Sequence, residues 1–294
     1  MEIRVLRYFL TVAREENITK AAELLHITQP TLSRQLMQLE EELGVKLFHR
    51  SNHKINLTED GMLLKKRAQD IVALTDRTTR EFAAKYEEGL SGEIVLGSGE
   101  TKNMHLLARL VADFRAAHPQ VQFDFYTANA DDVKERLDRG LIDIGLLTEP
   151  VDISRYHFIR LPYKERWGVL LREDSPLAQK TEIVPEDLAG VPLLVAGRPS
   201  VKNELEGWFG EVGGQLQIAG TYNLVNNAAV MVENGVGAAL CFPLGNIYEH
   251  LKFIPLSPRV ETGAVVVWKK ERNLSRAAEC FLEALRQYLK SISE

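Results

Sequence analysis

A chain of 294 residues exceeds the usual size of one domain and predicts at least two. The formal net charge of -5 argues against a nucleic-acid coat protein, and no apolar run approaches the roughly 20 residues that span a bilayer. Charges at Glu2, Arg4 and Arg7 replace an apolar signal segment, so we expect a cytoplasmic protein. Cys241 and Cys280 form no CxxC and predict neither a disulfide nor a metal site.

Helical periodicity predicts three short helices at the start of the chain. The first covers 5–14, and the second is expected to begin near Thr19 and to end before His26. Thr28 can cap the third helix, which Gly44 ends. Its inward stripe should consist of regularly spaced leucines: Leu32, Leu36, Leu39 and Leu43.

The opposite face of the third helix is expected to be largely polar. Its residues are Gln29, Thr31, Ser33, Arg34, Met37 and Gln38, with Pro30 in the first turn. The following segment predicts two short strands, 46–50 and 54–57, around a polar tip. Three helices followed by a hairpin give the order of a winged helix-turn-helix.

A local basic run lies on the predicted hairpin. Residues 1–58 hold eight basic and seven acidic side chains, so their total charge is unremarkable. No carboxylate, however, separates Lys46, Arg50 and Lys54, and two histidines, His49 and His53, lie among them. Such a run suits the phosphates of DNA, although a solvated surface loop would have the same composition.

The segment after Thr58 predicts one long helix. Glu59 and Asp60 suit its first turn, and no glycine occurs between Gly61 and Gly89. Residues spaced alternately by four and three form a seam: Leu64, Ala68, Ile71, Thr75, Thr78 and Phe82. This spacing is typical of a coiled coil between two copies, and the alternative is a helix packed on its own domain.

From residue 93 onward, strands alternate with helices. The first set has strands at 93–97, 121–126 and 143–147, with helices at 104–117 and 131–139. The second has strands at 167–171, 193–195, 217–221 and 238–242, with helices at 200–210 and 223–234. A strand at 263–268 and a helix at 275–292 close the chain. The pattern predicts two mostly parallel α/β lobes with a cleft between them.

Turns that join strands to helices are the candidate ligand site in this part. Free backbone N–H groups and the positive end of the helix dipole favour an anion there. The candidate residues are Ser98, Gly99, Glu100, Thr101, Lys102, Thr127, Ala196, Gly197, Arg198 and Asn223. Lys102 and Arg198 would attract an anion and Glu100 would repel it, so a small organic anion and a zwitterion both remain open. Ordinary caps and turns are the alternative for any one residue.

An enzyme and a solute-binding protein are the alternatives from other classes of protein. The chain has no GxSxG, HExxH, P-loop or CxxC motif, and its seven histidines show no ligand spacing. We therefore expect no enzyme, no catalytic or metal-binding residues and no cofactor. A solute-binding protein for transport would explain the two lobes but would require export and would leave residues 1–88 without a role.

Several motifs together resemble a known family. They are Leu6, Phe9 and Ala13, the pair Ala21 and Ala22, and the runs TQPTLSRQL at 28–36, LEEELGVKLFHR at 39–50 and LTEDG at 57–61. This set resembles the signature of LysR-type transcriptional regulators. The resemblance covers about 60 positions, and the rest of the chain agrees in length and in element order.

The resemblance implies a sequence-specific DNA-binding regulator with three parts. These are a winged helix-turn-helix at 1–58, a linker helix that pairs protomers at 59–90, and an effector domain similar to periplasmic binding proteins at 91–294. Lobe I would comprise about 91–161 and 267–294, and lobe II about 162–266. The implied partners are a double-stranded operator, a small effector, other copies in a homodimer or a homotetramer, and RNA polymerase.

The resemblance also assigns the DNA contacts. Gln29, Pro30 and Arg34 stand where family members read bases, and Ser33 where a base or phosphate is contacted. Arg34 can bond guanine, Gln29 adenine, and Pro30 with the Thr31 methyl can pack on thymine, while Gln38 shares their face. Lys46, Arg50, His53 and Lys54 would bind phosphates, with an intradomain ion pair as the alternative for Arg50. The wing tip, Asn52-His53-Lys54, departs from the glycine or arginine common in the family.

Overall fold

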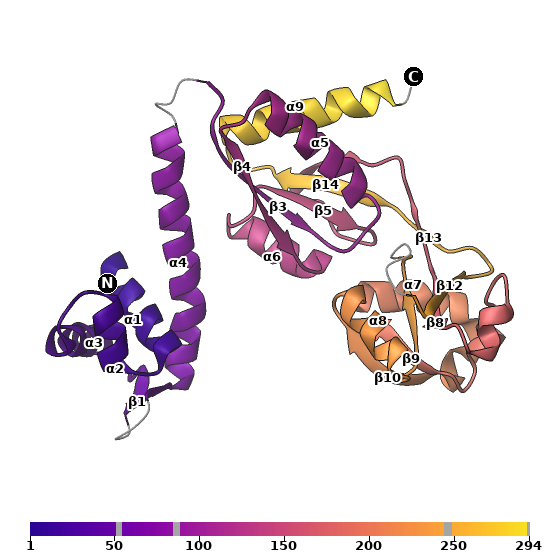
Figure 1. Ribbon diagram of the computed structural model, residues 1–294, viewed down its shortest axis with the longest axis horizontal. Coiled ribbons are helices and arrows are strands. Elements are labelled where there is room, and N and C mark those ends of the chain that lie inside the picture. The colour runs from indigo at the N-terminus through magenta and orange to yellow at the C-terminus, as the bar shows by residue number, and fades with distance from the viewer. Residues whose placement is uncertain (51–54, 85–88, 244–248, 293–294) are drawn as a thin grey trace. The chain divides into compact units, whose positions relative to one another are not determined.

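The computed structural model of the protein describes residues 1–50, 55–84, 89–243 and 249–292 (Figure 1). The chain forms two compact units, Met1–Ala83 and Ala84–Glu294. Within the described ranges, no helix is both long enough and apolar enough to cross a membrane.

The first unit has the predicted order of three helices and a hairpin. Helices α1 (Ile3–Glu15), α2 (Ile18–Leu24) and α3 (Gln29–Leu43) precede strands β1 (Phe48–Arg50) and β2 (Ile55–Leu57), which pair antiparallel. The predicted cap Thr28 is confirmed, since its hydroxyl accepts the backbone N–H of Thr31, and Gly44 ends α3 at a φ of 70°. The predicted N-cap of α2 at Thr19 is wrong, because the side chain of Asn17, two residues earlier, caps this helix and Ile18 begins it.

The last turn of α3 departs from the predicted stripe. Leu43 is 38% exposed, whereas the buried residue in this turn is Glu40 at 3%. The Glu40 carboxylate accepts the backbone N–H groups of Leu47 at 2.8 Å and Phe48 at 3.3 Å and pairs with Lys46 Nζ at 3.0 Å. A buried charge is tolerated because these donors replace water. Glu40 therefore joins α3 to the start of the hairpin.

The long helix α4 (Glu59–Ala84) begins as predicted. The Thr58 hydroxyl accepts the Gly61 N–H at 2.9 Å and donates to the Lys46 carbonyl at 2.6 Å. A side chain at Gly61 would place its Cβ only 2.1 Å from the Leu47 carbonyl oxygen, so this close approach requires glycine. The first turn of α4 is thereby fixed against the segment that leads into β1.

The predicted coiled-coil seam on α4 is wrong for its first half. Ala68 is fully buried in the core formed by α1, α2 and α3, and Leu64 and Ile71 pack against the same core. The alternative, packing on its own domain, holds for these residues. Four other apolar side chains of α4 are exposed: Met62, Leu63, Leu74 and Phe82.

The second unit contains two lobes, each built on a five-stranded sheet (Figure 1). Lobe I has the strand order β4-β3-β5-β14-β6, and lobe II the order β10-β9-β11-β8-β12. In each sheet one strand, β14 or β8, runs against the other four, so the expected mostly parallel arrangement is found.

The elements of lobe I are β3 (Gly92–Ser98), α5 (Met104–Ala117), β4 (Val121–Thr127), α6 (Ala130–Asp138), β5 (Ile144–Thr148), β6 (Tyr156–Arg160), β14 (Ala264–Lys269) and α9 (Arg276–Ser291). Alternate residues of β3 enter two cores. Ile94 and Leu96 pack with α5 and α9, and Val95 packs with α6. Helices therefore cover both faces of this sheet.

The elements of lobe II are β8 (Gly168–Arg172), β9 (Pro192–Ala196), α7 (Pro199–Phe209), β10 (Gln217–Tyr222), α8 (Val225–Glu233), β11 (Ala238–Cys241) and β12 (Leu251–Pro255), with three short 3₁₀ turns (Pro176–Gln179, Pro185–Leu188 and Gly210–Gln215). Val169 and Leu171 pack with α7, and Leu170 packs with α8. Strands β6 and β12 were not predicted.

The chain passes between the lobes twice. Strands β7 (Glu165–Arg166) and β13 (Glu261–Thr262) pair antiparallel at these crossings. Beside them, the indole N–H of Trp167 donates to the Thr262 hydroxyl at 2.8 Å, and both residues are buried. A short two-stranded ribbon therefore connects the lobes.

Replacing Glu40 by glutamine is expected to lower the free energy of unfolding of the first unit at neutral pH by about 1 to 3 kcal/mol, the range for a charged buried hydrogen bond. Burial raises the Glu40 pKa, but the N–H groups of Leu47 and Phe48 and the Lys46 ammonium outweigh it, so the pKa lies below the ordinary 4.5. The stabilisation should be complete above pH 4.5 and fall as pH drops further. Denaturant titrations of both proteins from pH 7 to pH 3 measure this, and a difference independent of pH would contradict it.

Candidate functional site

The N-terminal half of α3 presents a polar face to solvent. Gln29, Pro30, Arg34 and Gln38 are exposed, and Thr31 and Ser33 are half-buried. The Gln29 amide donates to the Ser33 hydroxyl at 3.0 Å. The Arg34 guanidinium makes no hydrogen bond or ion pair with any described residue. Its five donors are thus available to an external acceptor.

The C-terminal half of α3 has the opposite electrostatic character. Glu41 and Glu42 are exposed there, and the Met1 ammonium pairs with Glu42. Carboxylates repel a phosphate backbone, so only the first turns of α3 suit a nucleic acid. This agrees with recognition helices that contact bases through their N-terminal residues.

The predicted basic run is only partly free. Lys46 pairs with Glu40, which lies before the run in sequence and comes from α3. His49 is exposed on β1, and of Arg50 only the backbone is described. His53 and Lys54 lie outside the described residues.

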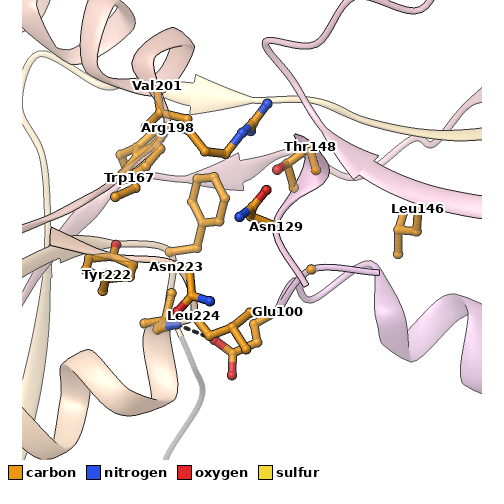
Figure 2. A pocket seen from close by; sticks show the side chains of 15 residues that line it. Glu100, Asn129, Leu146, Thr148, Trp167, Arg198, Val201, Tyr222, Asn223 and Leu224 are labelled. Atoms are coloured by element: carbon orange, nitrogen blue, oxygen red, sulfur yellow. Dashed lines mark hydrogen bonds between the residues drawn. The ribbon is translucent and has the colours of Figure 1, made fainter. Parts of the chain in front are cut away.

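A small cavity lies between the two lobes of the second unit (Figure 2). Its volume is about 70 Å³. Its walls are mostly apolar, with neutral polar groups from Asn129, Thr148 and Asn223. The rings of Trp167 and Phe242 form one wall, with centroids 4.4 Å apart. The remaining lining residues are Gly99, Glu100, Ala130, Leu146, Ala196, Arg198, Val201, Tyr222, Leu224 and Val225.

The structure distributes the ten predicted effector residues over three hollows. Gly99, Glu100, Ala196, Arg198 and Asn223 line the interlobe cavity. A hollow of about 520 Å³ is lined by Ser98, Gly99, Glu100, Thr101, Lys102 and Thr127, together with aromatic residues of β4. Gly197 lines a third hollow of about 420 Å³, which Arg198 and Asn223 also border.

Several residues of the interlobe cavity were not predicted. Trp167 and Phe242 are aromatic residues beside apolar strands, where sequence offers no sign that they face a cavity. Asn129 had a signal, because an asparagine before Ala-Asp-Asp is typical of an N-cap. Its side chain accepts the N–H groups of Asp131 and Asp132 at the start of α6.

Two of the three charged residues predicted to contact the effector, Arg198 and Glu100, already have protein partners. The Arg198 guanidinium pairs with Asp131 and donates to the Pro150 carbonyl at 3.1 Å. The Glu100 carboxylate accepts the Asn226 N–H at 3.1 Å and that of Val225. In Figure 2, Arg198 and Glu100 lie on two sides of the cavity. Arg198 therefore lines the cavity, but its charge is paired with Asp131 of the protein.

Hydroxyl groups near the cavity are also engaged. Thr101 donates to the carboxylate of Glu165, which is 1% exposed, and Glu165 also accepts the Asn103 side chain at 3.2 Å. Ser98 donates to the Gly99 carbonyl at 2.7 Å. Lys102 is exposed and makes no ion pair with the described residues. Among those residues, no group of His, Cys, Asp and Glu is arranged to hold a metal ion.

Two family models match the chain. The model of the LysR substrate binding domain covers residues 87–290, and that of the bacterial regulatory helix-turn-helix protein, lysR family, covers residues 3–62. The chain belongs to the LysR family of transcriptional regulators. Members of this family regulate transcription and are not enzymes, and they combine a DNA-binding helix-turn-helix with an effector-binding domain.

Relatives match over nearly the whole chain. The Hca operon transcriptional activator HcaR of Escherichia coli is 28% identical, with 100% of both chains covered. The regulator BsdA of Bacillus subtilis is 30% identical, with 96% of this chain and 99% of BsdA covered. The crystal structure of CbnR, a LysR family regulator, has a TM-score of 0.78 at 23% identity and covers 98% of this chain and 99% of its own. That likeness shows the shared fold.

Replacing Thr262 by valine is expected to destabilise the effector-binding unit by about 1 to 3 kcal/mol, because the buried Trp167 N–H would lose its acceptor. Thr181, an exposed threonine of lobe II, offers the control Thr181→Val, which should change stability by less than about 0.5 kcal/mol. Thermal unfolding followed by tryptophan fluorescence compares the two. Equal melting temperatures for both variants would show that the Trp167 bond contributes nothing.

Proposed function

We propose that this LysR-family regulator recognises its double-stranded operator through the first turns of α3. The observation that carries the proposal is the unpaired Arg34 guanidinium on an exposed polar face. The major groove admits a helix, and a guanidinium can bond O6 and N7 of guanine together. Gln29 would read an adenine edge, and Pro30 with Thr31 would contact a thymine methyl, while Ser33 and Gln38 complete the face.

We propose phosphate contacts for the wing residues Arg50, His53 and Lys54. Arg50 ends β1, and His53 and Lys54 come before β2 in the sequence, which is the order expected for the wing of a winged helix-turn-helix. Glu40 supports this role indirectly, because it fixes the start of the hairpin to α3. RNA polymerase, which the regulator would contact at the promoter, is the further partner that we propose. The proposed compartment is the cytoplasm, because the DNA is there.

We propose a small organic anion as the effector, with a zwitterion as the second candidate. Strand-to-helix turns at the interlobe cavity supply polar groups, and Lys102 adds an exposed cation nearby. Glu100 and Arg198 could contact such a ligand only after leaving their present partners. The proposed effector-binding residues lie in the part from residue 91 onward, after the DNA-binding part (1–58) and the linker helix (59–90).

We propose that α4 pairs protomers in a homodimer or homotetramer. The surface proposed for this contact is centred on the exposed residues Leu63 and Leu74, which lie on one side of the helix because they are eleven positions apart, with Met62 and Phe82 to either side. It takes the place of the half of the seam that packs on the three-helix core. A contiguous exposed apolar surface is typical of self-association. Self-association would also suit an operator with two half-sites.

Arg34→Ala is expected to weaken specific operator binding by about 1 to 3 kcal/mol and to lower the ratio of specific to nonspecific affinity. Lys54→Ala is the matched comparison, expected to weaken binding to all sequences similarly and to reduce the salt slope by about one. Fluorescence anisotropy with operator and random DNA over a salt series measures both. An unchanged specificity ratio for Arg34→Ala would rule out α3 as the reading helix.

Leu74→Asp is expected to dissociate the assembly while leaving the melting temperature of the first unit nearly unchanged, because Leu74 is 40% exposed. Ile71→Asp should instead lower that melting temperature, since it places a carboxylate against the packed core. Light scattering and thermal unfolding separate the two effects. An intact assembly for Leu74→Asp would contradict the proposed face of α4.

A further inference from the structure

Two charged side chains make contacts across the cleft between the lobes, and we call these contacts bridges. One of the side chains comes from lobe I and the other from lobe II. In the first, lobe I supplies the Glu100 carboxylate and lobe II the start of α8. In the second, lobe II supplies the Arg198 guanidinium and lobe I supplies Asp131. The interlobe cavity borders both bridges.

The first bridge caps a helix of one lobe with a side chain of the other. The N-cap residue of α8 is Leu224, whose side chain cannot accept a hydrogen bond. Glu100 takes that role by accepting the N–H groups of Val225 and Asn226 and the side-chain amide of Asn226. A carboxylate at this position also meets the positive end of the helix dipole.

The second bridge also starts from the first turn of a helix. Arg198 is the N-cap residue of α7, and its side chain is 9% exposed. Nε lies 3.2 Å from one Asp131 oxygen, Nη2 lies 3.4 Å from the other, and Nη2 donates to the Pro150 carbonyl. Two-point contact with a carboxylate fixes both position and orientation.

The interlobe cavity between the bridges is too small for most organic ligands. Its volume of about 70 Å³ holds a few waters at most, whereas ligand pockets usually measure ~300 to 1,000 Å³. Glu100 lines both this cavity and the 520 Å³ hollow, and Arg198 lines both this cavity and the 420 Å³ hollow. The two bridges therefore lie at the borders between the interlobe cavity and the two larger hollows, where the cavity would widen if the bridges broke.

We propose that Glu100 and Arg198 form a two-point latch that holds the lobes closed, and that an effector acts by opening it. This inference rests on the proposed function in one respect, that the effector binds between the lobes. A ligand shifts a conformational equilibrium only by binding one state more tightly. An effector larger than the present cavity binds the open arrangement better, so its binding and the breaking of the bridges are coupled.

Hydrogen exchange on the full-length protein tests the first bridge. Glu100→Gln keeps the shape but removes the charge, and the amides of Val225 and Asn226 should then exchange roughly tenfold faster or more. Asp113→Asn is the control, since Asp113 is an exposed carboxylate of α5 in the same lobe. It should leave the start of α8 unchanged. Unchanged exchange at Val225 and Asn226 in Glu100→Gln would overturn the first bridge.

The distance between the lobes tests the latch as a whole. Spin labels on the exposed Cys280 of α9 and on Asn203→Cys of α7 report it, while Cys241 is buried. Labelled chains diluted with unlabelled protein restrict the signal to pairs within one chain. The double variant Glu100→Gln/Asp131→Asn should shift the distribution to longer distances, with each single variant intermediate.

A double variant with the wild-type distance distribution would overturn the latch. Circular dichroism first establishes that each variant is folded. If the double variant does not fold, the distance distributions of the two single variants are compared with that of the wild type instead. Operator binding is measured separately by anisotropy. If the wild-type protein showed no specific operator binding, the proposed function would be wrong. The exchange and distance measurements would still test the latch.

Discussion

The first turn of a helix leaves backbone N–H groups without partners, and in the effector-binding unit these groups gather where the lobes face each other. The protein satisfies some of them with its own side chains. Asn129 caps α6 within lobe I, whereas Glu100 caps α8 from the opposite lobe. Because the N–H groups at the start of α8 are bonded by a side chain of the other lobe, their hydrogen bonds depend on the distance between the two lobes. The same requirement therefore shapes the cavity and restricts what can enter it.

A buried carboxylate has a comparable role in the DNA-binding unit. Glu40 is removed from water and is compensated by two backbone N–H groups and Lys46. Without it, the segment between α3 and β1 would lose its fixed position against the helix. Lys46 is then partly neutralised, whereas the Arg34 guanidinium has no partner among the described residues. Paired and unpaired charges are thus divided between two faces of α3.

Local chemistry predicted most elements correctly. Thr28 and Thr58 cap helices through their hydroxyls, Gly44 ends α3 at a positive φ, and the helix at 104–117 was predicted with the observed bounds. The missed strands β6 and β12 are edge strands. β6 buries only Tyr156 and so lacks a clear alternation, and β12 ends in Pro255, which argues against a strand. The other two edge strands, β4 and β10, were predicted, so the weak sequence pattern of β6 and β12, and not their edge position, hid them.

By itself, the sequence determined the family signature, the order of helices and strands, and the polar face of α3, because these depend on neighbouring residues and on periodicity. Only the tertiary structure decided the partners of charges and apolar stripes. Glu100 and Arg198 meet groups 125 and 67 residues away, and Ile71 packs against the three-helix core instead of a second copy. A carboxylate or a leucine has the same local pattern whichever surface it meets. Its partner is fixed only when distant segments are brought together by folding.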